Sequence, residues 1–275
     1  MHKRAKKALE SFLAEDIGKG DITSKLLGKK EVSANIISRQ QGIVAGVKYA
    51  KEIFVSRKCK VIILKKDGQK IKPNDMVMRI RGPAYSILSC ERIALNLLSR
   101  MSGIATQTNA LVKMIKKVNL HTELYSTRKT APGLRLFDKE AVEIGGGNKH
   151  RMSLDQMIMI KDNHIVVAKS VPGLIRLAKK RYKTIEVEVE NLNDAITAAI
   201  EGAAIIMLDN IPPTKIRKIV KVLEGLGLRK KVKLEASGGI DTSNVKSYAK
   251  SGVDMISIGK LTSSVSGLDL SLEVS

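Results

Sequence analysis

The sequence predicts an α/β protein in which a parallel β/α barrel follows a smaller N-terminal α+β domain. Two observations carry this prediction. From about residue 158 onward, short apolar strands alternate with helical stretches, a rhythm typical of parallel sheets with helical crossovers. Before residue 102, strand-like runs follow one another with turns and short helices between them. A chain of 275 residues is long enough to bury both cores.

Residues 1–101 are expected to form the N-terminal domain. Lys and Arg alternate with Ala and Leu at helical spacing over residues 1–14, and two glycines within 15–21 end that pattern. Within that helix, His2 is expected to be a solvated terminal residue. Strand-like runs follow, separated by turns, at 34–38, 59–64 and 76–80. We expect a small mixed sheet with one or two helices that serves as a scaffold or a dimer surface.

A linking helix is predicted over residues 86–101, and a second helix is expected to begin near Ser102 and Gly103. Arg92 lies on one face of the linking helix together with Leu88, Leu95 and Ser99. The barrel domain is assigned to residues 102–260. Residues 261–275 are expected to form a C-terminal tail. This tail either extends from the barrel or returns to the N-terminal domain.

The barrel domain repeats a unit of one short apolar strand and one helix. Pro172, Asn191 and Asp241 stand near helix starts, while Gly202 and Gly252 stand near helix ends. Repeated βα units of this kind indicate parallel strands. The predicted strands are 158–160, 185–189, 205–208, 232–234 and 255–258.

Polar residues at the strand ends favour a barrel over other parallel sheets, because a β/α barrel builds its ligand site at the carboxyl ends of its strands. The strands end in or are followed by Lys161, Asp209-Asn210, Ser237-Gly238-Gly239 and Gly259. Glu186, Glu188 and Glu190 share one face of their strand, because side chains alternate with a period of two. The alternative is an edge strand with one solvated face.

Cationic side chains gather between residues 127 and 165, on elements that follow two predicted strands. Such cations repel one another, so their natural complement is a ligand with several negative charges. Guanidinium groups bind planar carboxylates bidentately. The cations are Arg128, Lys129, His150, Arg151, Lys161 and His164, of which His164 is more typical of a turn-organising residue than of a catalyst.

The opposite charge comes from Glu188 and Asp209, which are oxygen ligands suited to Mg²⁺ that also binds substrate phosphates. Backbone N–H groups at Gly238, Gly239 and Gly259 can hold a phosphate at the last two strands, although each motif alone also fits a tight βα turn. Together these parts match a ribose that carries a phosphate at one end and a pyrophosphate at the other.

The net charge of +22 raises the alternative of a nucleic-acid-binding protein. However, the chain has few aromatic side chains on which nucleic-acid bases could stack, with no Trp, three Phe and five Tyr. We interpret the basic excess as a solvated surface. No apolar run approaches membrane-spanning length and no signal peptide is recognisable, so we expect a cytoplasmic protein that binds neither membrane nor nucleic acid. Cys59 and Cys90 lack metal or redox spacing and are expected to be reduced core residues.

Several motifs, in order and spacing, make the chain similar to the quinolinate phosphoribosyltransferase family, also called carboxylating nicotinate-nucleotide pyrophosphorylases. The likeness extends over nearly the whole chain. It rests on EDIGKGDIT (15–23), ERIALNLLSRMSGIAT (91–106), TRKTAPGLR (127–135), GGG followed by HR (145–151), IKDNHI (160–165), EVEVEN (186–191), MLDN (207–210) and LEASGGI (234–240).

The resemblance implies a type II phosphoribosyltransferase fold, in which an incomplete parallel β/α barrel accompanies an N-terminal α+β sandwich domain. It further implies transfer of a phosphoribosyl group from phosphoribosyl pyrophosphate to quinolinate, with decarboxylation to nicotinate mononucleotide, in de novo NAD biosynthesis. Carried over position by position, the quinolinate contacts fall on Arg92, Arg128, His150, Arg151 and Lys161. The phosphoribosyl contacts fall on Lys129, Lys161, Glu188, Asp209, Ser237, Gly238, Gly239 and Gly259, of which Lys129, Lys161, Glu188 and Asp209 would be catalytic.

Arg92 precedes the barrel, so the resemblance implies a homodimer in which Arg92 is donated across the interface, and it leaves open a larger assembly. The sequence departs from the family pattern at the phosphoribosyl end, where Lys260 and Ser263 replace Ala and His. Ser126 and Lys149 are two further departures that leave the expected contacts intact. A relative linked to molybdenum transport shares part of the pattern, but the complete IKDNHI and EVEVEN motifs favour the quinolinate enzyme.

Overall fold

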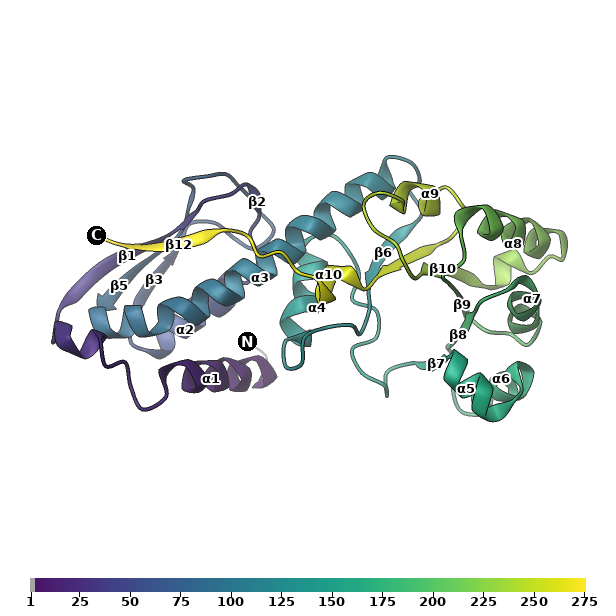
Figure 1. Cartoon of the computed structure of the whole chain (residues 1–275), viewed down its shortest axis with the longest axis horizontal. Coiled ribbons are helices and arrows are strands. Elements are labelled where there is room, and N and C mark those ends of the chain that lie inside the picture. Colours follow the sequence, from purple (N-terminus) through teal and green to yellow (C-terminus); the bar gives the residue numbers. More distant parts are fainter. Residues whose placement is uncertain (1–2) are drawn as a thin grey trace. The chain divides into compact units, whose positions relative to one another are not determined.

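The computed structural model describes residues 3–275 and divides the chain into two compact units. Unit 1 extends through Asn109 and adds Ala131–Gly146 and Ser264–Ser275, while unit 2 comprises Ala110–Thr130 and Gly147–Ser263. The chain therefore passes between the units more than once, as the colours of Figure 1 show. His2, expected to be a solvated terminal residue, lies outside the described residues.

Unit 1 contains a four-stranded sheet with the order β12-β1-β5-β3, and every neighbouring pair in it is antiparallel. The expectation of a mixed sheet was wrong. Positive-φ residues at Gly68 and Asn74 let the chain reverse between strands, and such reversals give antiparallel neighbours. The strands are β1 (Glu31–Ser38), β3 (Lys60–Ile63), β5 (Met76–Pro83) and β12 (Leu270–Val274), and β2 (Gly42–Ile43) pairs separately with β4 (Lys70–Ile71).

Helices supply the rest of the core of unit 1. Helix α2 buries Tyr49, Ile53 and Phe54, and the Tyr49 ring meets Phe137 edge to face at 4.8 Å. Helix α1 buries Ala5, Leu9 and Leu13, which recur every fourth residue as an amphipathic helix requires. These elements are α1 (Lys3–Ile17), the 3₁₀ turn η1 (Ser24–Leu27), α2 (Val47–Ser56) and α4 (Arg135–Ile144).

One continuous helix, α3 (Ala84–Lys116), replaces the two helices predicted on either side of Ser102 and Gly103. Gly103 lies inside this helix and does not end it. A Cβ atom at this position would lie 2.0 Å from the carbonyl oxygen of Ser266. The glycine thus permits the returning C-terminal segment to pack directly on the helix backbone. The glycine that was expected to separate two helices instead marks a position where another segment packs closely on one helix.

Unit 2 is an open, wholly parallel sheet of six strands with the order β6-β11-β10-β9-β8-β7. Because β6 and β7 remain edges, the predicted incomplete β/α barrel is confirmed as the fold class. The strands are β6 (Glu123–Ser126), β7 (Ile158–Ile160), β8 (Ile185–Val189), β9 (Ile205–Asp209), β10 (Lys233–Ser237) and β11 (Met255–Ile258). On the four inner strands, the side chains of Val187, Ile206, Leu234 and Ile256 are fully buried.

Helices alternate with these strands along the chain, as parallel connections require (Figure 1). Two of them begin at side-chain caps, because Ser170 accepts a hydrogen bond from the Gly173 N–H and Asn191 accepts one from the Asp194 N–H. The elements are α5 (Asp162–Ala168), α6 (Val171–Lys179), α7 (Leu192–Ile200), α8 (Pro213–Gly225), η2 (Arg229–Lys231), α9 (Val245–Ala249) and α10 (Lys260–Ser263). Across residues 3–275, every helix is too short or too polar to cross a bilayer.

Candidate active site

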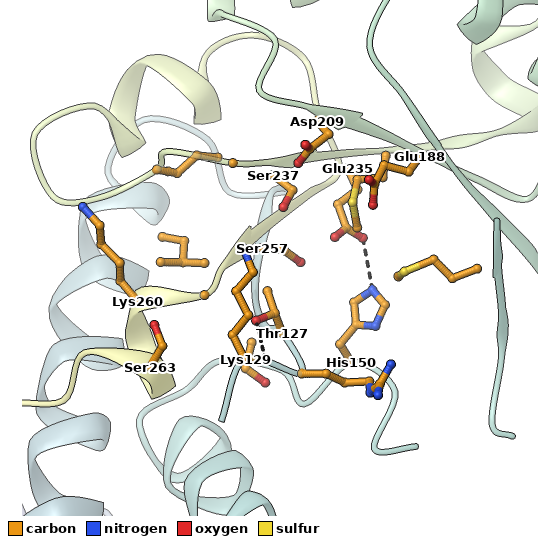
Figure 2. Close-up of a pocket in the computed structure, with 18 of the residues that line it drawn as sticks. Thr127, Lys129, His150, Glu188, Asp209, Glu235, Ser237, Ser257, Lys260 and Ser263 are labelled. Atoms are coloured by element: carbon orange, nitrogen blue, oxygen red, sulfur yellow. Dashed lines mark hydrogen bonds and ion pairs between the residues drawn. The ribbon is translucent and has the colours of Figure 1, made fainter. Parts of the chain in front are cut away.

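A cavity of about 520 Å³ lies in unit 2, at the carboxyl ends of its parallel strands. Register explains why these ends meet, since Ser237 at the end of β10 pairs with Asp209 at the end of β9, and Ile258 pairs with Ser126. Figure 2 shows side chains from these strands directed into one space. The lining residues are Ser126, Thr127, Arg128, Lys129, His150, Arg151, Met159, Lys161, Glu188, Met207, Asp209, Glu235, Ser237, Gly238, Gly239, Ile240, Ser257, Ile258, Gly259, Lys260 and Ser263.

The structure brings five of the predicted cations to this cavity, namely Arg128, Lys129, His150, Arg151 and Lys161. His164 does not line it. Its Nδ1 instead accepts a hydrogen bond of 2.9 Å from the Lys161 backbone N–H, which orders the turn from β7 into α5. Arg92 is exposed on α3 in unit 1 and is also absent from the lining.

Two guanidinium groups define one end of the cavity. Nε of Arg128 is buried and, within residues 3–275, has no hydrogen-bond partner. Nη1 of Arg151 donates to the Met157 carbonyl oxygen at 3.1 Å. Burial, and secondly the charge of Arg128, lower the pKa of Arg151. An anionic ligand at this end would relieve both the repulsion and the missing hydrogen bond.

Two carboxyl groups stand on the neighbouring strands β8 and β9. Glu188 forms an ion pair with Lys161. Asp209 directly follows Leu208, which pairs with Val189 of β8. Burial raises the pKa of Asp209, and the charge of Glu188 raises it further, although Lys161 opposes this. A divalent cation would remove that repulsion, and carboxylate oxygens are the ligands that Mg²⁺ prefers. The donor set therefore fits the expected metal.

Glycines form the opposite end of the cavity. Gly238 and Gly239 have φ values of +89° and +62°, so the chain turns sharply as it leaves β10. A Cβ atom at Gly238 would lie 2.3 Å from Oδ1 of Asn210, and one at Gly259 would lie 2.9 Å from Cδ of Lys129. The bare backbone at these turns suits a phosphate group.

Replacement of Gly238 with alanine is expected to destabilise the protein by about 2–4 kcal/mol, because left-handed strain adds to a steric clash. Gly239→Ala is the matched control, since that position shares the positive φ but, among residues 3–275 other than its chain neighbours, a Cβ atom there would meet nothing within 4 Å. It should cost only about 1 kcal/mol. Urea denaturation of both variants measures the difference, and equal losses would show that the clash with Asn210 is relieved by relaxation.

Lys260 and Ser263, the two departures at the phosphoribosyl end, also line the cavity. Nζ of Lys260 lies 3.3 Å from Oδ2 of Asp241, and both side chains are solvent-accessible. Since this ion pair is exposed, it contributes little to stability and leaves the lysine able to turn toward an anion. Figure 2 places Lys260 and Ser263 beside Lys129, on the side of the cavity away from His150.

Sequence reasoning missed a buried acidic pair beneath His150. Glu186 and Glu235 are fully buried, and one oxygen of each lies within 4.8 Å of Nε2 of His150 and of the other. Burial, and secondly the charge of Glu235, raise the pKa of Glu186 to about 9. One signal could have revealed Glu235: it is an acid between the apolar residues Leu234 and Ala236, both of which are buried.

Apolar lining residues were also missed. Met159, Met207, Ile240 and Ile258 line the cavity between its charged groups. Methionine is adaptable and packs well against aromatic rings, so these side chains suit a flat ligand. No sequence signal separates them from ordinary core residues, because each stands in an apolar strand or shortly after one.

Comparisons with known proteins place this arrangement in a family. Residues 21–102 match the model described as quinolinate phosphoribosyl transferase, N-terminal domain, and residues 104–273 match the corresponding C-terminal domain. The chain belongs to the quinolinate phosphoribosyltransferase family. The membership expected from the motifs is thereby confirmed.

Relatives in the quinolinate phosphoribosyltransferase family match over almost their full length. A probable carboxylating nicotinate-nucleotide pyrophosphorylase of Archaeoglobus fulgidus is 47% identical over 93% of this chain and 98% of its own. The carboxylating nicotinate-nucleotide pyrophosphorylase of Homo sapiens is 35% identical over 97% of this chain and 90% of its own. The solved structure of the nicotinate-nucleotide pyrophosphorylase from Francisella tularensis superposes with a TM-score of 0.92, at 39% identity, over 99% of this chain and 96% of that one.

Proposed function

We propose that this chain transfers the phosphoribosyl group of phosphoribosyl pyrophosphate to quinolinate and releases nicotinate mononucleotide, pyrophosphate and carbon dioxide. The observation that carries the proposal is a single cavity with guanidinium groups at one end and, at the other, glycine turns beside Glu188 and Asp209. Family members that are named carboxylating nicotinate-nucleotide pyrophosphorylases and that match nearly the whole chain support the same reaction. This makes the chain a pentosyltransferase of de novo NAD biosynthesis.

Quinolinate is assigned to the end of the cavity where Arg128 and Arg151 lie. Each of its two adjacent carboxylates can take a bidentate guanidinium contact, and Lys161 can neutralise remaining charge. His150 lies at this end as well. The methionine side chains supply apolar contacts for the pyridine ring.

Phosphoribosyl pyrophosphate is assigned to the other end. Its 5-phosphate meets the backbone N–H groups at Ser237, Gly238, Gly239 and Gly259, and Lys129 approaches its pyrophosphate. Glu188 and Asp209 would hold Mg²⁺ together with substrate phosphates, and the metal would neutralise the charge that builds up on the leaving pyrophosphate.

The cavity performs the transfer largely by position and charge. Arg128 and Arg151 hold the ring so that its nitrogen faces C1 of the ribose, which removes much of the entropic barrier. As the C1–O bond to pyrophosphate breaks, Glu188 stabilises the positive charge on the ribose and Lys129 stabilises the negative charge on the leaving group. The nitrogen lone pair then forms the N–C1 bond. The 2-carboxylate leaves as carbon dioxide, its bonding electrons remain beside the positive ring nitrogen, and C2 takes up a proton.

In this proposal the protein forms a homodimer, and the second subunit completes each site. The protein is proposed to be located in the cytoplasm. Arg92 is exposed on unit 1, and the resemblance assigns it to quinolinate. We therefore infer that Arg92 of the partner subunit reaches the cavity. A two-fold dimer would contain two such composite sites.

Ligand-induced stabilisation tests the substrate class. Quinolinate, and phthalate as its analogue without the ring nitrogen, should raise Tm, with a gain of about 2.7 kcal/mol at 100 times the Kd. Nicotinate has a single carboxylate and should stabilise less. A DNA oligonucleotide at physiological salt should have no effect. Stabilisation by the oligonucleotide without stabilisation by quinolinate would favour a basic nucleic-acid-binding protein, and stabilisation by molybdate alone would favour the relative linked to molybdenum transport.

A further inference from the structure

A continuous chain of polar contacts runs from the buried Glu235 through His150 to Arg151. Oε2 of Glu235 lies 3.3 Å from Nε2 of His150, and Nδ1 of His150 lies 2.8 Å from the backbone nitrogen of Arg151. Figure 2 shows the first of these contacts, with the imidazole directed toward Glu235. Sequence reasoning assigned no role to Glu235.

These contacts fix the tautomer of the imidazole. A backbone N–H can only donate, so Nδ1 of His150 must be the acceptor and carries no proton. The ring proton of the neutral imidazole is therefore on Nε2, which donates to Oε2 of Glu235 at 3.3 Å. Oε2 of Glu186 lies 3.4 Å from the same nitrogen. Both ring nitrogens are engaged within the protein, and the side chain is only 6% exposed. His150 thus has no N–H left for a ligand.

The backbone at His150 depends on these contacts. Its φ of +53° lies in the left-handed region, which a residue with a side chain adopts at a cost. The ring is held at both nitrogens, and Tyr125 packs edge-on against it at 5.9 Å. The turn directs the next residue, Arg151, along the cavity wall, where its Nη2 lies 3.2 Å from Sδ of Met159.

We propose that Glu235 and His150 are positioning residues for quinolinate: Glu235 holds the imidazole as the Nε2–H tautomer, and Nδ1 holds the backbone of Arg151 so that its guanidinium faces the substrate carboxylate. This inference rests on the proposed function. It differs from a direct contact between His150 and quinolinate, which would require Nε2–H to leave Glu235 and would strand a buried acceptor.

Variants at His150 separate the two roles. Asparagine adopts left-handed φ readily, and its Oδ1 can replace Nδ1 as the acceptor for the Arg151 N–H, but it offers no group at the Nε2 position. His150→Asn should therefore raise the KM for quinolinate by less than about 5-fold, whereas His150→Ala should raise it about 10- to 100-fold. The KM for phosphoribosyl pyrophosphate should change in neither variant. If His150→Asn is as impaired as His150→Ala, His150 contacts quinolinate directly and the inference is wrong.

Variants at Glu235 test the other link. Glu235→Gln keeps an acceptor oxygen for Nε2–H and should stay within about 3-fold of wild type, while Glu235→Leu should raise the KM for quinolinate about 10-fold. In the His150→Asn background, Glu235→Leu should have little further effect, because the tautomer no longer matters. Additive losses in this double-mutant cycle would overturn the coupling.

Nitrogen-15 NMR of histidine-labelled protein reads the tautomer directly, and it keeps the proposal testable where Glu235→Leu fails to fold. The chain has four histidines, so the His150 signals are assigned by their loss in His150→Asn. We expect one protonated and one unprotonated ring nitrogen, unchanged by quinolinate. An imidazolium, or an Nδ1–H tautomer, would overturn the inference. Wild-type protein that does not turn over quinolinate would instead refute the proposed function, whichever tautomer the spectrum shows.

Discussion

Arg92→Ala and Lys129→Ala are each expected to be nearly inactive alone, and an equal mixture of the two is expected to recover activity. Lys129 lines the cavity, so its loss disables the cavity of its own subunit. Arg92 serves the neighbouring subunit in our proposal. A heterodimer of the two variants would then contain one site with both residues intact and one site with neither. Random exchange makes half of the dimers hybrid, so about a quarter of the wild-type activity should return.

The complementation experiment needs two controls. Each variant taken alone through the same dissociation and mixing must stay inactive, and native mass spectrometry must show that hybrid dimers have formed. Proven exchange without recovered activity would place Arg92 in the site of its own subunit or outside the site altogether. Recovery well above a quarter would mean that one of the single variants retains activity.

Arg128→Lys is expected to lower kcat/KM for quinolinate by about 30- to 150-fold, equivalent to about 2–3 kcal/mol, while the KM for phosphoribosyl pyrophosphate stays within about 3-fold of wild type. Lysine keeps the positive charge but cannot form the paired N–H contacts of a guanidinium with a planar carboxylate. Among the described residues, Nε of Arg128 is buried without a protein partner, so the contact that fails is one that only the ligand supplies.

Arg217→Lys is the matched control for this substitution, because Arg217 is exposed on α8 and does not line the cavity. It should leave all kinetic parameters unchanged. Steady-state kinetics with each substrate varied in turn gives the comparison. Equal weakening of both substrates by Arg128→Lys would show that the assignment of the two ends of the cavity is wrong.

The sequence predicted the strand ends well. Each strand of the parallel sheet is a short apolar run, so the end of the run also identifies the polar residue at the end of the strand. Lys161 and Asp209 were found in this way, each directly after or at the end of an apolar run. Glycines were harder to interpret. Gly238 was correctly placed at a turn, but Gly103 was taken as a helix start although its role is to let another segment approach α3.

Glu235 could not be assigned from its strand alone. An acid on a buried strand is exceptional, yet the reason for it appears only when β10 lies beside β9 and β11 and the loop with His150 folds over the strand ends. The sequence also did not predict that Ala131–Gly146 belongs to unit 1. Helix α4 in this segment packs Phe137 against Tyr49, which is remote in sequence. Contacts of this kind depend on tertiary structure, which local patterns do not encode.

Turnover of carboxyl-labelled quinolinate is a direct test of the proposed reaction. Purified protein is incubated with Mg²⁺, phosphoribosyl pyrophosphate and quinolinate that carries carbon-13 in its 2-carboxylate. We predict equal amounts of labelled carbon dioxide, nicotinate mononucleotide and pyrophosphate, and no product when either substrate is omitted. Turnover of nicotinate in place of quinolinate, or release of pyrophosphate without labelled carbon dioxide, would refute the proposed reaction.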